Sequence, residues 1–181
     1  MSAGLVAIPT LETPRLRLRP YRLDDFDAYA EMWADPAVVR FIGGTPFTRE
    51  ASWTRFLRQI GLWHHLGFGF FALEHRETGA LAGEAGFHDL RRDVTPSLEG
   101  TMECGWALTA SMQGQGLAEE AMRAAIGWAG AHGSGTRLTC MINPGNGGSL
   151  RVAEKLGFAE FARTTYGGSP IILLERSRQA A

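Results

Sequence analysis

The chain has 181 residues, of which 18 are basic, 19 acidic and 23 glycine, and its formal net charge is −1. This balance argues against a nucleic-acid-binding face, and a glycine share nearly twice the usual ~7% still stays below that of low-complexity chains. A chain of this length with 45% apolar residues is expected to form one domain, residues 1–181, around one core.

The two cysteines and the N-terminal segment indicate in which compartment the protein is expected to act. Cys104 and Cys140 stand in apolar runs without a C-x-x-C motif, which argues against a disulfide framework and against a zinc site. His64, His65 and His75 have no cysteine or carboxylate at metal-ligand spacing, so no metal is predicted. Residues 1–9 lack signal-peptide features, and no apolar run reaches ~18 residues. We expect a cytoplasmic protein with no membrane association.

The first third of the chain predicts one strand and two helices. Residues 15–19 alternate arginine and leucine and predict a strand. Asp24 is suited to cap a helix that Asp35 and Pro36 stop. Thr48 is suited to cap a second helix. The expected core-facing stripe of that helix is Trp53, Phe56, Leu57, Ile60 and Trp63.

The middle of the chain changes to a period of two. Residues 69–74, 80–88 and 102–108 predict three strands joined as an antiparallel meander. Alternation in the second of these strands gives two faces. One face carries Ala82, Glu84, Gly86 and His88, and the other carries Leu81, Ala85 and Phe87. The small and polar first face is suited to a cleft.

The last third predicts a helix at 117–131 that ends in residues 132–135, a strand at 137–142 and a helix at 146–156. Strands at 158–165 and 171–175 follow, with a frayed tail at 176–181. A strand, a helix and a strand in this order indicate a locally parallel pair. The expected fold is mixed α/β of the α+β class, with a mostly antiparallel sheet of six to seven strands and about four helices.

A glycine-containing turn opens directly into the helix at 117. Gly114 and Gly116 let backbone N–H groups approach an anion, and the helix N-terminus adds partial positive charge. The turn lacks the lysine of a Walker loop and the G-x-G-x-x-G spacing of a dinucleotide site. Spacing alone leaves a phosphate cradle and an ordinary turn open, and a general nucleotide-phosphate binder is a further option.

Four motifs in order resemble the GCN5-related N-acetyltransferases, or GNAT proteins. The coenzyme A signature Q/R-x-x-G-x-G/A is matched by 113–118, and the strand E-x-G-Y/W-x-L by 103–108. Asn146 to Ser149 followed by Lys155 to Phe158 resembles the N-x-x-S…K-L-G-F element. Residues 11–19 and 33–36 resemble the RimJ/RimL branch of ribosomal-protein-alanine acetyltransferases. The resemblance covers almost the whole chain.

The resemblance implies direct transfer of an acetyl group from acetyl-CoA to an amine in a ternary complex. Backbone N–H groups of the turn are implied to hold the coenzyme pyrophosphate, and the strand end the pantetheine arm. The implied coenzyme-binding residues are Leu108, Thr109, Gln113, Gly114, Gln115, Gly116, Leu117, Ala118 and Asn146. For Asn146, a helix N-cap is the alternative. The donor is implied to be acetyl-CoA, and a longer acyl donor stays open.

Catalytic groups are implied by the same resemblance. Ser149 matches a position from which a hydroxyl can protonate the leaving thiolate, with a backbone-bonded helix serine as the alternative. Relatives outside the branch use a tyrosine at the position of Ala153. Glu103 is our first candidate for the base, with Glu84 and His88 as the others.

The expected acceptor is a primary amine, either a protein N-terminus or a small molecule. The near-neutral chain does not favour a strongly cationic aminoglycoside, although Glu84, Glu99 and Glu103 leave that open. A non-catalytic acyl-CoA-binding or regulatory module is the alternative function, motivated by the missing tyrosine. The late strands of such sheets can pair between two copies, so a homodimer is a further option.

Overall fold

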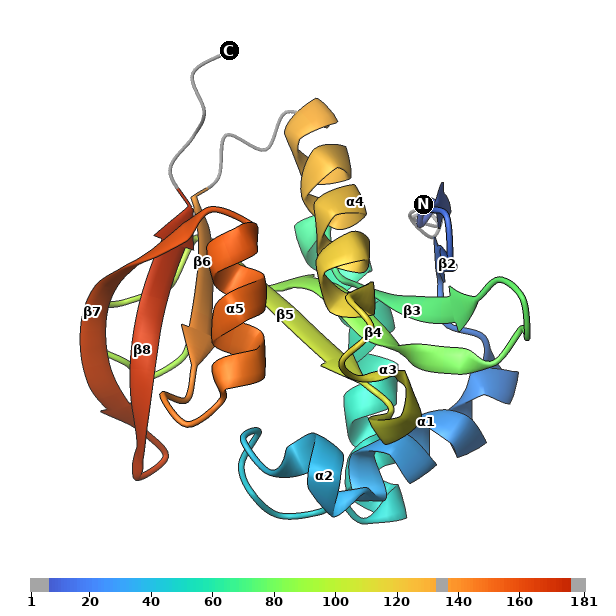
Figure 1. Ribbon diagram of the computed structural model, residues 1–181, viewed down its shortest axis with the longest axis horizontal. Helices are drawn as coiled ribbons and strands as arrows, with labels where there is room; N and C mark the ends of the chain where they lie inside the picture. Colours follow the sequence, from blue (N-terminus) through green and yellow to red (C-terminus); the bar gives the residue numbers. More distant parts are fainter. Residues whose placement is uncertain (1–6, 133–136, 177–181) are drawn as a thin grey trace, which may run out of the picture.

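Eight strands form one sheet in the order β1-β2-β3-β4-β5-β6-β8-β7 (Figure 1). The computed structural model describes residues 7–132 and 137–176. Every neighbouring pair is antiparallel except β5 and β6, which are parallel. The strands are β1 (Leu11–Glu12), β2 (Leu16–Arg19), β3 (Phe70–His75), β4 (Leu81–His88), β5 (Met102–Leu108), β6 (Leu138–Ile142), β7 (Phe158–Tyr166) and β8 (Ser169–Arg176).

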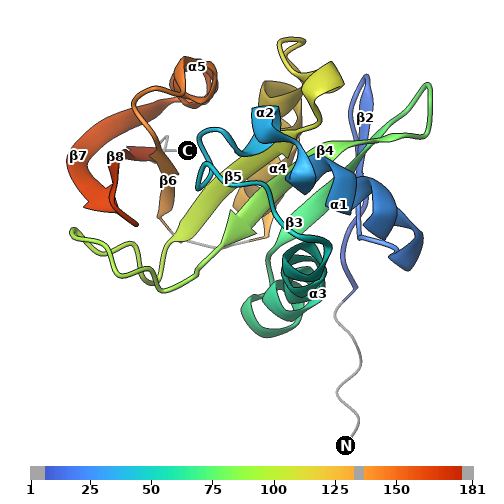
Figure 2. The same cartoon turned by 90° about the horizontal axis from the view of Figure 1, so that it is seen from below.

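Helices cover both faces of the sheet, with α3 and α5 on opposite sides (Figure 2). The α-helices are α1 (Phe26–Ala34), α2 (Pro36–Val39), α3 (Arg49–Leu66), α4 (Leu117–Ala131) and α5 (Gly147–Lys155), with 3₁₀ turns at Leu23–Asp25 and Ala110–Met112. Apolar side chains of α4 and α5 pack with the central strands in the largest core cluster. A second cluster joins α1, α2 and the middle of α3.

The predicted fold class is confirmed, with two differences in element number. The sheet has eight strands because Leu11 and Glu12 pair with Leu18 and Arg17 as a short edge strand, which is too short to give a periodic signal. A fifth helix, α2, begins where Pro36 follows the cap Asp35. The locally parallel pair and the 117–131 helix are confirmed. Residues 133–135 and 177–181 of the predicted helix end and tail lie outside the described residues, whereas Arg176 belongs to β8.

Two predictions about the N-terminal helices can be compared with the structure. Asp25, and not Asp24, precedes α1, because Leu23–Asp25 form a 3₁₀ turn. The Asp25 carboxylate accepts hydrogen bonds from the Arg19 guanidinium at 2.7 Å instead of capping the helix, so the prediction for Asp24 is wrong. Thr48 caps α3 as predicted, accepting a hydrogen bond from the N–H of Ala51.

The core-facing stripe of α3 differs from the prediction. Trp53, Leu57 and Ile60 are 39%, 44% and 48% exposed, whereas Phe56 and Trp63 are buried as expected. The buried face includes Gln59, whose amide donates a 3.4 Å hydrogen bond to Glu84 on β4. The helix therefore turns a partly polar face to the sheet, which apolar periodicity does not reveal.

A β-bulge in β4 changes the predicted two faces of that strand. Leu73 pairs with Gly83 and Glu74 with Leu81, so Ala82 is the extra residue. Ala82 packs in the core with Ala85 and Phe87, whereas Leu81 joins the α1 and α2 cluster. The prediction is wrong for Ala82 and Leu81 because a bulge breaks strict alternation. It holds beyond the bulge, where Glu84 and His88 both line a cavity.

Replacing Gly86 with alanine is expected to destabilise the sheet by about 2–3 kcal/mol. An added Cβ would lie 2.2 Å from the Gly69 carbonyl oxygen and 2.6 Å from Phe70 Cα, so the backbone of the neighbouring segment would have to move. The control is Gly100→Ala, where φ is +77° and the space is open, with an expected cost of about 1 kcal/mol. Urea unfolding measures both, and equal losses would contradict the steric argument.

Candidate active site

The parallel pair β5 and β6 separates after two residue pairs. Met102 pairs with Leu138 and Glu103 with Thr139, but both strands run on without further pairing between them. Figure 1 shows β5 running away from β6 at an angle. A cavity of about 380 Å³ opens between the separated strands, within the size range of small-molecule sites. The unpaired edge of β5 can hydrogen-bond an extended ligand.

The loop that follows β5 leads straight into α4, as the motif predicts. Gly114 and Gly116 adopt φ of +74° and +79°, the left-handed region that favours glycine. An added Cβ would meet nothing within 4 Å at Gly114, and only Arg15 at 3.7 Å at Gly116. The first N–H groups of a helix lack intrahelical acceptors, so α4 begins with backbone donors directly after these two glycines.

Side chains around the loop stabilise it from within. The Gln113 amide donates to the Leu108 carbonyl oxygen at 3.1 Å, and the Gln115 amide donates to the Ser111 carbonyl oxygen at 2.8 Å. Of the predicted coenzyme residues, Leu108, Leu117 and Ala118 are buried in the core. Thr109 donates its backbone N–H to Ala82. The predicted site along 108–118 therefore offers backbone groups to a ligand more than side chains.

The contact of Arg15 with the loop before α4 was not predicted from the sequence. Its guanidinium donates to the Gln115 carbonyl oxygen at 2.8 Å and forms an ion pair with Glu120 at 2.7 Å. Arg15 thus joins the segment before β2 to the loop and the first turn of α4. The only sequence signal was the Arg–Leu alternation, which indicates a strand and not a contact about 100 residues away.

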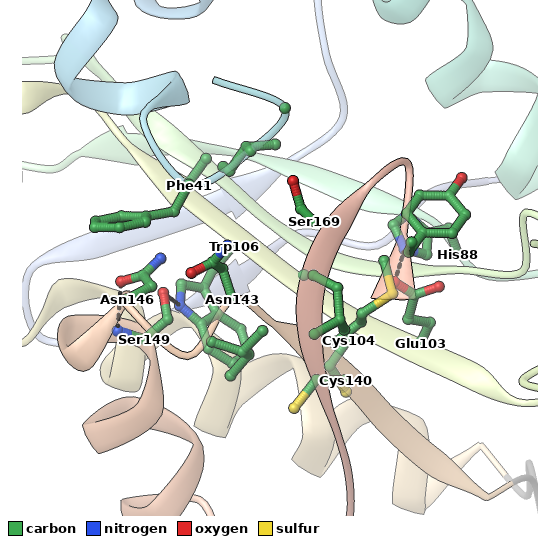
Figure 3. Close-up of a pocket in the computed structure, with 18 of the residues that line it drawn as sticks. Phe41, His88, Glu103, Cys104, Trp106, Cys140, Asn143, Asn146, Ser149 and Ser169 are labelled. Atoms are coloured by element: carbon green, nitrogen blue, oxygen red, sulfur yellow. Dashed lines mark hydrogen bonds and ion pairs between the residues drawn. The ribbon is translucent and has the colours of Figure 1, made fainter. Parts of the chain in front are cut away.

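Asn146 and Ser149 lie at the start of α5, on the β6 side of the cavity (Figure 3). The Asn146 side chain accepts the backbone N–H of Ser149 at 3.1 Å, so Asn146 is an N-cap. Its amide nitrogen stays available as a donor. The Ser149 hydroxyl oxygen accepts a 3.3 Å hydrogen bond from the indole of Trp106 on β5. Its proton is then left to donate elsewhere, which the backbone-bonded alternative would not allow.

Glu103 lies on the opposite wall, with 4% of its surface exposed. Arg92 Nε donates to both carboxylate oxygens at 2.8 and 3.1 Å, and His88 Nε2 lies 3.0 Å from Oε1 (Figure 3). Burial raises the pKa of Glu103, but hydrogen bonding and charge from His88 and Arg92 outweigh it, so its pKa lies below the usual value. Glu103 is therefore an ionised carboxylate and a weak proton acceptor.

Glu84 and its partners form a closed cluster deeper in the cavity wall. Its carboxylate accepts hydrogen bonds from Tyr21 at 2.9 Å and from Arg55 at 2.8 Å, in addition to Gln59. Only 1% of Glu84 is exposed. Burial, followed by the charge of Glu84, raises the pKa of the Tyr21 hydroxyl. A carboxylate with three donors is less available to an amine than the sequence suggested.

Cys104 and Cys140 both line the cavity as free thiols. Burial raises the pKa of each, so neither is a ready nucleophile. Among residues 7–132 and 137–176, no group of three or more histidine, cysteine or carboxylate side chains is placed to hold a metal ion. Within the same ranges no helix has the length and apolar content needed to span a bilayer.

The predicted site residues thus fall into two groups. Glu103, Asn146 and Ser149 line the cavity, whereas residues 108–118 lie outside its lining. Both groups meet at one end of the sheet, because α4 and α5 begin where β5 and β6 end (Figure 1). The arrangement offers backbone donors to an anionic group and a separate cavity to a smaller one.

Comparison with known families decides the identity of this arrangement. The family described as "Acetyltransferase (GNAT) domain" matches residues 15–159. The chain belongs to the GNAT acetyltransferase family. The assignment of the loop before α4 to coenzyme A stays a prediction.

Similar proteins match most of the chain. A Bordetella pertussis structure described as a GnaT-family acetyltransferase has 32% identity and a TM-score of 0.83, covering 94% of this chain and all of that one. An uncharacterised N-acetyltransferase, p20, of Bacillus licheniformis is 28% identical over 82% of both chains. RimL, a ribosomal L7/L12 α-N-protein acetyltransferase in complex with coenzyme A, shares the fold at 17% identity, with a TM-score of 0.74 over 93% of this chain and 97% of RimL.

Proposed function

We propose that this GNAT protein is an N-acetyltransferase that transfers an acetyl group from acetyl-CoA directly to a primary amine. The separation of β5 from β6 carries the proposal, because it opens a cavity between a carboxylate on one wall and a hydroxyl on the other. The likeness to RimL, an α-N-protein acetyltransferase, supports a protein N-terminus as acceptor, and the cavity volume suits a small molecule equally. In this proposal the protein acts in the cytoplasm.

The residues present fit acetyl-CoA. The open space in front of Gly114 and Gly116 suits a pyrophosphate, since an anion there faces backbone donors and the positive end of α4. The unpaired edge of β5, which ends at Leu108, offers backbone pairing to the pantetheine arm, and the Asn146 amide offers a further donor. The Thr109 N–H is already bonded to Ala82, so in this proposal Thr109 lies beside the arm without donating that N–H to it. When bound, acetyl-CoA supplies the acetyl group as an activated thioester.

Two side chains carry the proton transfers in this proposal. Glu103 takes the proton of the acceptor amine, directly or through water, and Ser149 gives a proton to the departing thiolate. Trp106 occupies a lone pair of the Ser149 oxygen, which leaves the hydroxyl proton to point away from the indole. Acid and base thus stand on opposite walls of one cavity.

A pH profile tests the part of Glu103. Because its pKa lies below the usual range, Glu103 is ionised throughout pH 6 to 9, and activity over that interval should rise only as the amine loses its proton. Glu103→Gln is expected to lower kcat/KM by about tenfold, less than the roughly 10²–10⁴ of a well-matched base, without changing the profile's shape. Exposed Glu99→Gln serves as control. An acid limb that shifts in Glu103→Gln alone would contradict the depressed pKa.

A non-catalytic acyl-CoA-binding module is the second candidate. It is favoured by Ala153 at the position of the family tyrosine and by the contacts of Arg92 and His88 with Glu103. A thiol-release screen with N-terminal peptides, amino acids, polyamines and aminoglycosides separates the two functions. Binding of acetyl-CoA without turnover would favour the module. Absence of both would overturn both candidates, and equal affinity for CoA and ADP would point to a general phosphate binder.

A further inference from the structure

Not every charged side chain that lines the cavity forms an ion pair. Three arginines and two glutamates line it, namely Arg40, Arg55, Arg92, Glu84 and Glu103. Arg55 forms an ion pair with Glu84 at 2.8 Å, and Arg92 forms one with Glu103 at 2.8 Å. Both carboxylates are almost fully buried and hold their partners at hydrogen-bond distance.

Both carboxylates already have partners, so neither is a free anion that would hold a polycationic ligand. Glu84 already accepts from Tyr21 and Gln59 as well as from Arg55, and Glu103 has His88 at 3.0 Å besides Arg92. A cation that entered would have to displace a buried arginine from its partner, which leaves an uncompensated buried charge. Polyamines and aminoglycosides therefore find no free anionic group in this lining, although the glutamates alone had suggested one.

Among the three arginines of the lining, Arg40 differs from Arg55 and Arg92 in its lack of a carboxylate partner within the described residues. It ends α2, is exposed, and forms no ion pair with any carboxylate in the described part of the chain. Its guanidinium carbon lies 5.0 Å from the centre of the Phe41 ring. Phe41 in turn packs against Gly145, where an added Cβ would lie 3.1 Å from the ring. Figure 3 shows Phe41 above Asn146, so this loop reaches the wall that carries Ser149.

We propose that Arg40 binds a carboxylate of the acceptor, so that the preferred substrate is an amine that also carries a carboxylate near its amino group. An unpaired guanidinium at the mouth of a partly enclosed cavity attracts anions more strongly than one on an open surface. Its planar donors also match a carboxylate geometrically. The inference rests on the proposed function and names its substrate class.

The experiment compares matched acceptors that differ by one charge. Amino acids are measured against their carboxamides, and tripeptide amides that begin with Asp or Glu against those that begin with Asn or Gln. The selectivity is the ratio of kcat/KM within each pair, for the native protein, Arg40→Gln and Arg163→Gln. Arg163, on β7 outside the cavity lining, controls for the loss of one positive charge. Intrinsic differences in amine reactivity cancel when ratios are compared between variants.

Arg40→Gln is expected to lower the carboxylate selectivity about fivefold, with the KM for acetyl-CoA unchanged, and Arg163→Gln to leave both unchanged. The pair that responds tells an α-carboxylate from a side-chain carboxylate. An unchanged ratio in Arg40→Gln, a preference for polyamines, or a raised KM for acetyl-CoA alone would each overturn the inference. Calorimetric titration of the same pairs into CoA-saturated protein gives the ratio without turnover, so a failure of catalysis is distinguishable from a failure of this inference.

Discussion

Gly116→Val is expected to abolish measurable acetyl-CoA binding while the protein stays folded. The space in front of Gly116 is open except for Arg15, so a valine side chain would occupy the volume that we assign to the pyrophosphate. The same side chain is strained at φ +79°, which tilts the first N–H groups of α4 away from their present direction. We expect a loss of affinity of at least a hundredfold, about 2.7 kcal/mol, by isothermal titration calorimetry.

The chain offers a matched control for the backbone strain. Gly79 in the turn between β3 and β4 has φ +69° and open space around it, so Gly79→Val carries similar strain at a distance from the loop. Both variants should lose comparable stability, about 1–3 kcal/mol, in thermal unfolding. Full acetyl-CoA affinity in Gly116→Val would contradict the assignment of this loop to the coenzyme. A matching loss of affinity in Gly79→Val would show that backbone strain alone is responsible.

Ser149→Ala is expected to lower kcat about a hundredfold with little change in the KM for acetyl-CoA. Protonation of the leaving thiolate acts in the transition state, so its loss reduces kcat and kcat/KM together. The cap joins the side-chain oxygen of Asn146 to the backbone N–H of Ser149, so it survives the substitution. Steady-state kinetics with a thiol-release readout measures both constants.

Two further variants separate an acid from a structural serine. Ser169→Ala removes a hydroxyl that also lines the cavity, from β8, and should leave kcat unchanged. Ser149→Thr keeps the hydroxyl and should restore part of the rate. Equal kcat values for Ser149→Ala and the native protein would remove Ser149 from the mechanism. A raised KM with normal kcat would instead assign it to coenzyme binding.

The fold was predictable from the sequence wherever local signals agree with the global arrangement. Thr48 at the start of α3 and the 117–131 apolar pattern both act within one helix turn of the residues that they order, and both are confirmed. The bulge at Ala82 and the rotation of α3 toward Glu84 depend on neighbours that are distant in the chain. The spacing of apolar residues does not report buried polar contacts or bulges, so these features became visible only in the three-dimensional structure.

The site was predictable to a different extent. The motifs singled out Glu103 and Ser149, and both line one cavity. Their catalytic roles stay predictions. The sequence did not indicate that Arg92 and His88 hold Glu103, because ion-pair partners are chosen by strand position and loop path. The same applies to Arg15, whose contact with Gln115 spans 100 residues.

Because β5 and β6 pair at only two positions, the two strands can rotate relative to one another about their paired end. Backbone pairs at Met102 and Glu103, with the Thr101 and Thr139 hydroxyls 2.8 Å apart, join the two strands at one end. At the other end the strands are unpaired, and the side-chain hydrogen bond from Trp106 to Ser149 links β5 to α5. A small rotation about the paired end changes the gap between the walls much more at the unpaired end than at the paired one. A ligand that pairs with both walls would fix this angle, so amide hydrogen exchange should slow on β5 and β6 together.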